Sequence, residues 1–296
     1  MGHDHSLARG ASSKRRLAIV LALSGTYMIV EVLGGLWTGS LALLADASHM
    51  LTDVAGIALA LLAIRLGERP PNTRKTYGYQ RAEILAAVAN SVVLLGISGY
   101  VLYEAYQRFR APPEVQSGVM LAVAAVGLLV NGVGLLVLRG SATESLNLKG
   151  AYFEVLSDFF TSVGVLVAGL VMLMTGWYYA DPIVSAGIGL FILPRTWRLL
   201  REAVDVLLEG TPRDLDLAGL RRALEQIEGV ASVHDLHAWS LTSGVNAITA
   251  HLVLRPASAH ESVLLAAQES LAAKFPGSHA TLQLERAGSE CHGAHS

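Results

Sequence analysis

Residues 40–62 form an apolar run that is long enough to cross a lipid bilayer and yet contains Asp46, His49 and Asp53. A helix of about 20 apolar residues spans the hydrocarbon core of a membrane. Positions i, i+3 and i+7 fall on one helical face, so the three polar groups share one stripe. A charged group near the centre of such a helix costs roughly 2.5–3.5 kcal/mol. This stripe therefore needs a compensating partner.

A second apolar stretch, residues 147–176, offers that partner. Glu154 and Asp158 repeat there the i, i+4 spacing of His49 and Asp53. The two pairs supply one imidazole and three carboxylates, a suitable tetrahedral set for a divalent metal such as Zn²⁺. We expect the pairs to face each other inside the membrane and to bind a travelling cation. A structural polar network, or a proton relay without metal, is the alternative.

The composition places these stretches in a membrane protein. Of 296 residues, 52% are hydrophobic and 16% are charged, whereas a soluble domain carries about 25% charged residues. The apolar excess lies in the first 200 residues, which indicates a multi-pass membrane domain followed by a soluble one. A net charge of −2 argues against a nucleic-acid binder. The single cysteine, Cys291, excludes an intramolecular disulfide framework.

The sequence predicts six membrane spans and four parts of the chain. The spans lie at residues 17–38, 41–66, 80–106, 116–138, 149–175 and 179–200. The parts are a flexible leader (1–16), the membrane domain (17–206), a soluble domain (207–287) and a flexible tail (288–296). A signal peptide is rejected because the first apolar segment continues without a cleavage site and further spans follow. His3 and His5 could contact a metal, but a disordered terminus is the simpler interpretation.

Basic residues predict the orientation of the spans. They gather before the first span and in the segments on the same side, for example at Arg16, Arg74 and Arg201, whereas the opposite side holds Arg108 and Arg110. Both termini are therefore predicted to be cytoplasmic. In that topology His49 and Asp53 meet Glu154 and Asp158 near the middle of the bilayer. Asp46 lies closer to the outer mouth, where we expect it behind the ligands or on the exit path, with a ligand role as the alternative. Other polar residues of the spans could line the path or link helices: Glu31, Glu83, Asn90 and Asn131. For Glu83, near a cytoplasmic end, a solvated position is the alternative.

The soluble part is predicted to be a small α+β domain. Residues 216–229 and 260–275 have helical patterns, whereas residues 230–241, 245–256 and 279–285 alternate like strands. The order α-β-β-α-β suggests a sheet with one face covered by helices. Its imidazole, carboxylate and thiol groups favour Zn²⁺ or a similar metal, with surface or capping roles as the alternative. These groups belong to His234, His237, His251, Glu285, Cys291 and His292.

Several motifs together resemble the cation diffusion facilitator family, and most of all its bacterial exporters for zinc, cobalt and cadmium resistance. They are LALLADASHMLTD, NLKGAYFEVLSD, ADPIVS, VDVLLEGTP and VHDLHAWSLTSG. The resemblance implies a homodimer with six transmembrane helices and a cytoplasmic ferredoxin-like domain. It also implies exchange of a divalent metal for protons by alternating access, with Zn²⁺ as the transported and regulatory ion and Cd²⁺ and Co²⁺ as further cargo.

The resemblance also implies site residues. It places the transport site at His49, Asp53, Glu154 and Asp158, and cytoplasmic metal ligands at His234, His251 and Glu285. Many zinc-selective members have His at the position of Glu154, so the site here is harder and more anionic. Relatives with a histidine near Gln283 coordinate metal differently. The loop after the second span reads KTYGYQRAE, with Tyr77 and Tyr79 where some relatives have histidines, and no metal site is predicted there. Arg81 and Glu209 match a charge pair at the dimer hinge.

The sequence therefore predicts a proton-coupled exporter of divalent metal cations in the inner (plasma) membrane, not an enzyme. Two rival functions remain open. A metal-dependent membrane enzyme lacks support because the chain has no H-E-x-x-H motif and no distinct nucleophile beside the cluster. A membrane metal sensor would use the soluble domain as its reader and would transport nothing.

Overall fold

The computed structural model describes residues 3–67, 69–139, 146–242, 244–256, 258–275 and 277–286. The side chains of residues 3–17 and of several residues between 52 and 67, Asp53 among them, lie outside the described part. The chain divides into two compact units. One holds residues 1–58 and 89–199, and the other holds residues 59–88 and 200–296.

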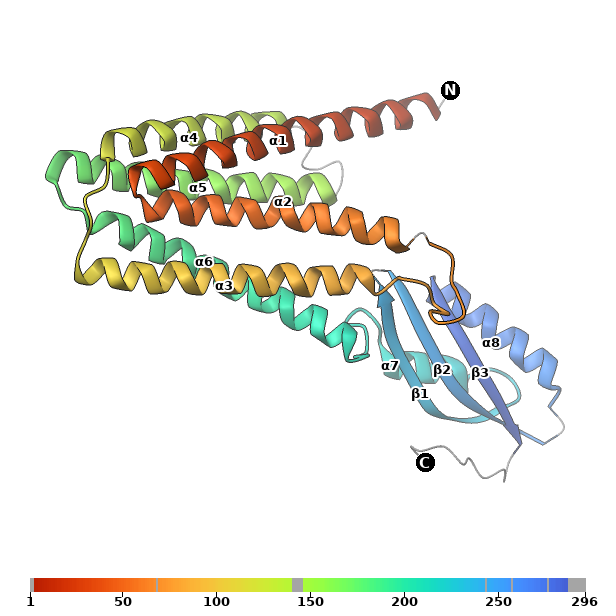
Figure 1. The fold of residues 1–296 in the computed structure, drawn as a ribbon. Coiled ribbons are helices and arrows are strands. Elements are labelled where there is room, and N and C mark those ends of the chain that lie inside the picture. Colours follow the sequence, from red (N-terminus) through yellow and green to blue (C-terminus); the bar gives the residue numbers. More distant parts are fainter. Residues whose placement is uncertain are drawn as a thin grey trace. The chain divides into compact units, whose positions relative to one another are not determined.

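Among the described residues, the first two thirds of the chain form six long helices (Figure 1). Five carry described segments that are long and apolar enough to cross a membrane, and the second contributes the apolar segment Leu41–Leu51. The predicted spans coincide with these helices, although α3 and α6 extend further than predicted. The backbone of the predicted leader is helical from His3 onward, and its flexibility remains a prediction. The helices are α1 (His3–Thr38), α2 (Leu41–Gly67), α3 (Ala82–Arg110), α4 (Ser117–Arg139), α5 (Leu146–Thr175) and α6 (Ala180–Leu207).

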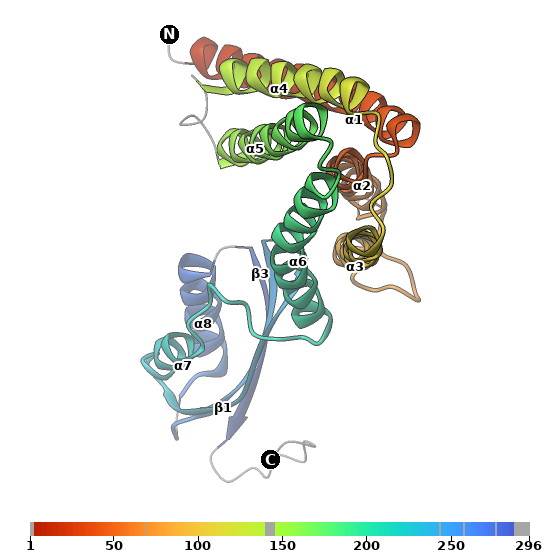
Figure 2. The same cartoon turned by 90° about the vertical axis from the view of Figure 1, so that its left-hand side faces the viewer.

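Helices α1, α4 and α5 lie side by side (Figures 1 and 2). A Cβ atom at Gly127 of α4 would lie 2.1 Å from the Tyr27 hydroxyl of α1, so glycine permits this close approach. Asn131 of α4 donates a hydrogen bond to Ser162 of α5 (3.2 Å). Small residues and buried polar bonds of this kind are typical of membrane helix interfaces.

The C-terminal domain has the predicted order α-β-β-α-β. Strands β1 and β2 are antiparallel, and β3 adds to β2 in parallel, giving the sheet order β1-β2-β3. The parallel pair requires a crossover, which α8 provides. The elements are α7 (Leu217–Glu225), β1 (Val230–Thr242), β2 (Val245–Leu254), α8 (His260–Lys274) and β3 (Ser278–Arg286).

The two short helices cover one face of this sheet (Figure 2). Leu220 of α7 and Leu271 of α8 pack with Ile248 and Leu252 of β2 in one buried cluster. Side chains alternate between the faces of a strand. His251, between buried Ala250 and Leu252, therefore lies on the face away from the helices.

Candidate metal centres

The membrane cluster, defined here as His49, Glu154 and Asp158, joins α2 to α5. His49 Nε2 lies 3.6 Å from Glu154 Oε1 and 3.9 Å from Asp158 Oδ1. Ligand atoms around a tetrahedral Zn²⁺ are about 3.3–3.5 Å apart, given metal bonds of about 2.0–2.2 Å. The observed distances are slightly wider than this spacing. His49 and Asp158 are 3% and 5% exposed, whereas the Glu154 side chain is 28% exposed. A small inward movement would place three donors around one cation.

The side chain of the fourth predicted ligand, Asp53, lies outside the described residues. Its place four residues after His49 in α2 puts it on the same helical face, one turn further along. Its role as a ligand stays a prediction.

Asp46 ties α2 to α5 one turn before His49. Thr161 of α5 donates a hydrogen bond to Asp46 Oδ1 (2.7 Å), and Asp46 is fully buried. Glu31 of α1 is buried in the same unit and accepts a hydrogen bond from Tyr27 (2.9 Å). Asp46 therefore links the two helices that carry the membrane cluster, and its role behind the ligands or on the exit path stays a prediction.

Arg195 of α6 is a partner of the cluster that the sequence analysis missed. Its Nη1 donates to Glu154 Oε1 at 3.0 Å and its Nη2 donates to Glu154 Oε2 at 2.7 Å. This is the two-bond arrangement in which guanidinium and carboxylate groups fit best. From the sequence, Arg195 is one of the basic residues on the cytoplasmic side that predict the orientation of the spans. A charged residue within an apolar helix was the signal that it needed a partner.

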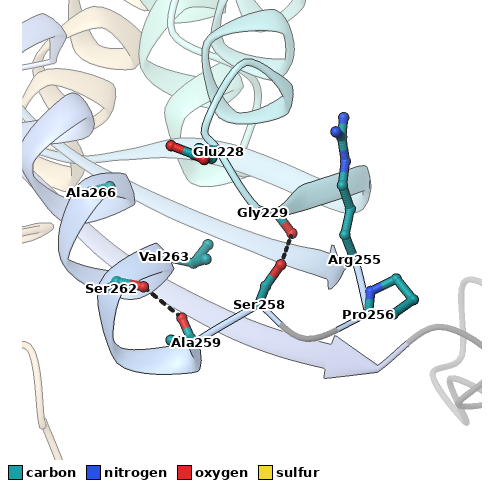
Figure 3. Close-up of a pocket in the computed structure, with 9 residues that line it drawn as sticks. All are labelled: Glu228, Gly229, Arg255, Pro256, Ser258, Ala259, Ser262, Val263 and Ala266. Carbon is teal, nitrogen blue, oxygen red and sulfur yellow. Dashed lines mark hydrogen bonds between the residues drawn. The ribbon is translucent and has the colours of Figure 1, made fainter.

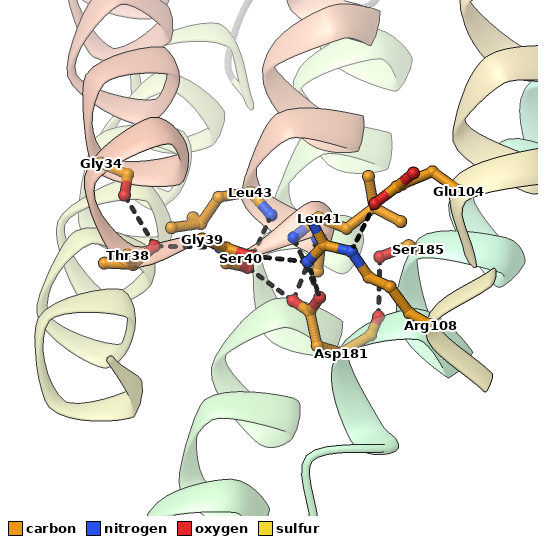
Figure 4. A network of polar contacts seen from close by, with 11 residues as sticks. Gly34, Thr38, Gly39, Ser40, Leu41, Leu43, Glu104, Arg108, Asp181 and Ser185 are labelled. Carbon is orange, nitrogen blue, oxygen red and sulfur yellow. Dashed lines mark hydrogen bonds and ion pairs between the residues drawn. The ribbon is translucent and has the colours of Figure 1, made fainter. Parts of the chain in front are cut away.

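Asp181 holds the beginning of α2 in place (Figure 4). The backbone N–H of Leu41 and of Ala42 and the hydroxyl of Ser40 donate to its carboxylate at 2.9, 3.1 and 2.6 Å. Such N–H groups have no partner within their own helix. Arg108 bridges the Gly39 carbonyl (2.6 Å) and Asp181 (3.4 Å). The helix that carries His49 is thus anchored to α6 at its N-terminal end.

In the C-terminal domain, His234, His251 and Glu285 form a second cluster, named here the sheet cluster. Their candidate ligand atoms all lie within 4.8 Å of one another. His234 of β1 is the register partner of His251 of β2, and Glu285 of β3 pairs with Val253, two residues along on the same face. Glu285 contacts His234 Nε2 at 3.0 Å and His251 Nδ1 at 2.8 Å. Two imidazoles and one carboxylate suit Zn²⁺, with a fourth position left for water or another group.

Electrostatics favour the ionised form of Glu285. Desolvation acts to raise the pKa of this carboxyl, but the hydrogen bond from His234 and the charges of His251 and His234 outweigh it, so its pKa lies below the ordinary value. An ionised carboxylate is the form that coordinates metal. Glu285 therefore offers the sheet cluster a carboxylate that is already ionised.

Asp235 is a neighbour of the sheet cluster that the sequence analysis did not single out. The β1–β2 register shifts between His234 and His237, and Asp235 there has a φ of 49°. Its carboxylate contacts His237 Nε2 (2.9 Å) and His251 Nε2 (3.7 Å). His237, also considered a ligand from the sequence, therefore faces Asp235, outside the three-residue sheet cluster.

The predicted charge pair is formed in the second unit. Arg81 Nη2 donates to Glu209 Oε1 at 2.8 Å. Glu209 has a left-handed φ of 61° just after α6, a conformation that costs a non-glycine residue energy.

Of the loop tyrosines, Tyr77 packs edge-on against His279 (5.9 Å between ring centroids) and Tyr79 lies beneath Lys75. Glu83 accepts a hydrogen bond from Thr242.

A cavity of about 500 Å³ lies at the start of α8 (Figure 3). Arg255, Ser258 and Ser262 line it together with Glu228, and none of the three sheet-cluster residues does. Cys291, His292 and the side chains of His3 and His5 lie outside the described residues, so their roles stay predictions.

Comparison with known proteins identifies the family from both halves of the chain. Residues 17–208 match the model of the cation efflux transmembrane domain, and residues 212–287 match that of the cation efflux protein cytoplasmic domain. The chain belongs to the cation efflux family. This confirms the resemblance found in the sequence and makes the protein a multi-pass membrane transporter rather than an enzyme.

Named relatives of the family align over nearly the whole chain. Metal cation efflux system protein CzcD of Cupriavidus metallidurans is 46% identical, with 98% of this chain and 92% of that protein covered. The cadmium, cobalt and zinc/H⁺-K⁺ antiporter of Bacillus subtilis is 40% identical, covering 96% and 92%. Zinc transporter ZitB of Escherichia coli is 40% identical, covering 99% and 95%.

One solved structure is also similar in sequence. It is the metal-bound C-terminal domain of the CzcD transporter from Cupriavidus metallidurans, 42% identical over 24% of this chain and 99% of that chain. Its TM-score of 0.23 is too low to support a statement about the fold.

Proposed function

We propose that this protein exports divalent metal cations, zinc above all and also cadmium and cobalt, from the cytoplasm in exchange for protons. The observation that carries the proposal is the membrane cluster, in which buried His49 lies 3.6 and 3.9 Å from carboxylates of another helix. The ions named for the relatives, zinc, cadmium and cobalt, support the choice of cargo. The transport site consists of His49, Asp53, Glu154 and Asp158.

Proton coupling follows from the chemistry of the ligands. An imidazole must be neutral and a carboxylate ionised to bind metal, so metal binding releases protons and protonation expels metal. A site that faces the cytoplasm would load the cation, and a site that faces acid outside would release it. The cavity beside His49, between α2, α3 and α6, has about 10 Å³, room for about one water. Rocking of the helices would open the site to one side of the membrane at a time, which is alternating access.

The remaining features complete the proposal. The protein would cross the inner membrane six times with both termini in the cytoplasm, and it would act as a homodimer. Its C-terminal domain would be ferredoxin-like, and the sheet cluster would bind regulatory zinc. The Arg81–Glu209 pair would stabilise the dimer hinge. If Arg81→Ala leaves both dimerisation and transport at wild-type levels, the hinge role is wrong.

The central test is zinc uptake into proteoliposomes under an imposed pH gradient. We expect gradient-dependent uptake by the wild type and a loss of at least about 100-fold in Asp158→Asn, since even residues behind a metal ligand are worth 10- to 100-fold. Asp205→Asn, an exposed aspartate on α6, is the matched control and should transport normally. Absence of uptake of zinc, cadmium and cobalt by folded wild type would favour the sensor instead.

A further inference from the structure

Arg195 places a positive charge directly beside the proposed transport site. Its guanidinium binds both oxygens of Glu154, and Glu154 Oε1 is also the atom 3.6 Å from His49 Nε2. One carboxylate oxygen thus faces a permanent positive charge on one side and the metal position on the other. Arginine stays protonated at every physiological pH, so this charge is constant.

The sequence around Arg195 shows why this arginine requires a partner. It follows Phe191, Ile192 and Leu193 in a helix apolar enough to span a membrane, where an arginine is costly unless it is paired. Pro194, just before it, lies inside α6 and lacks the N–H that would bond to the preceding turn. The helix is therefore locally weakened at the residue that carries the charge.

Charge balance gives this pair a consequence for the cargo. Three ionised carboxylates, with Asp53 counted as predicted, and a neutral imidazole would hold a divalent ion with one negative charge in excess. Arg195 cancels that excess. It also repels the incoming cation, because like charges a few ångströms apart raise each other's energy.

We propose that Arg195 is an affinity-setting residue of the transport site. When the site holds no metal, the guanidinium binds Glu154 in place of the metal. When the site holds a metal, the guanidinium weakens its binding, so that the cation is released on the outer side of the membrane. This inference rests on the proposed function. It predicts a sign: removing the charge tightens metal binding, whereas a residue that merely orients Glu154 would weaken binding when lost.

The test is equilibrium Zn²⁺ binding to the purified full-length protein in detergent, with His234→Ala and His251→Ala in every sample to remove the sheet cluster. We expect Arg195→Gln to lower Kd about 3- to 10-fold, the range for a partly exposed ion pair near 1 kcal/mol. Arg195→Lys keeps the charge but loses the two-bond contact with Glu154, and its Kd should lie between those of the parent and Arg195→Gln. Arg198→Gln removes an exposed charge three residues along α6 and should change Kd less than twofold.

Transport supplies a second readout. In proteoliposomes Arg195→Gln should lower both KM and kcat for zinc, because tighter binding slows release. Weaker or unchanged zinc binding by folded Arg195→Gln overturns the inference. If Arg195→Gln does not fold, Arg195→Ala, which also removes the charge, decides, since an unchanged or raised Kd in that variant overturns the inference.

Asp158→Asn in the same background separates this inference from the proposed function. If that variant binds zinc as well as its parent, the transport site itself is wrongly assigned. If it loses binding while the Arg195 variants match their parent, only the role of Arg195 fails.

Discussion

The membrane cluster and the sheet cluster use the same side-chain chemistry but are built differently. In the sheet cluster, neighbouring strands with a fixed register hold His234, His251 and Glu285 in contact at 2.8–3.0 Å. In the membrane cluster, two helices bring His49 to 3.6–3.9 Å from the carboxylates of Glu154 and Asp158. Arg195 forms an ion pair with Glu154. A sheet fixes its side chains through a continuous hydrogen-bond ladder, whereas packed helices can slide or tilt.

This difference suggests a division of work. A site on a rigid sheet suits a metal that stays bound and reports its concentration. A site between helices that can separate suits a metal that must leave. The following predictions probe this contrast, from the largest expected effect to the smallest.

The membrane cluster should depend on the anchor of α2. Asp181→Asn replaces an acceptor of backbone N–H groups by an amide that also donates, in a fully buried position. Disrupting such a buried network costs about 2–4 kcal/mol, so the apparent unfolding temperature of the full-length protein should fall by about 5–10 °C. Thermal denaturation in detergent measures this.

The same variant should weaken zinc binding at the membrane cluster and leave the sheet cluster unaffected. Asp205→Asn, on the exposed side of α6, is the control. Equal losses at both clusters would mean that the two sites are not independent.

The sheet cluster should be dispensable for movement of the ion itself. His251→Ala removes one of the three candidate ligands and should weaken zinc binding there at least 10-fold, while the maximal uptake rate changes less than about twofold. Uptake should then respond less to rising cytoplasmic-side zinc. His260→Ala, an exposed histidine on α8, is the control. Abolished uptake in folded His251→Ala would contradict the division of work.

The smallest expected effect is the loss at low pH of the stability that Glu285 contributes. Because the folded-state pKa of Glu285 is below its ordinary value, its ionised form stabilises the fold above the unfolded-state pKa of about 4.3. That contribution is lost as pH falls through the lower folded-state pKa. In metal-free protein at pH 6, β3 amides should exchange faster in Glu285→Gln than in wild type, because the variant lacks the charge that stabilises the sheet.

At pH values below the folded-state pKa of Glu285 the two proteins should exchange alike. A wild-type advantage that persists unchanged into strong acid would show that the carboxylate charge does not contribute.

Much of the fold was predictable because it depends on local patterns. Apolar length defined the long helices, and alternation within residues 230–254 defined two strands whose observed bounds differ little from the prediction. The i, i+4 spacings also predicted that His49 lies near Glu154 and Asp158, and the structure brings these three side chains together. The position of Glu285 on the face of His251 followed from strand alternation once β3 was placed beside β2.

The tertiary structure alone decided which distant residues complete the sites. The bonds from Arg195 to Glu154 and from Asp181 to the start of α2 join residues 41 and about 140 positions apart, and no spacing along the chain encodes them. The register shift that turns Asp235 toward His237 and His251 is likewise a property of paired strands. The sequence by itself determined which elements form and which side chains they carry, because those depend on local periodicity. Packing decided the partners, because the approach of two helices depends on the shape and charge of both.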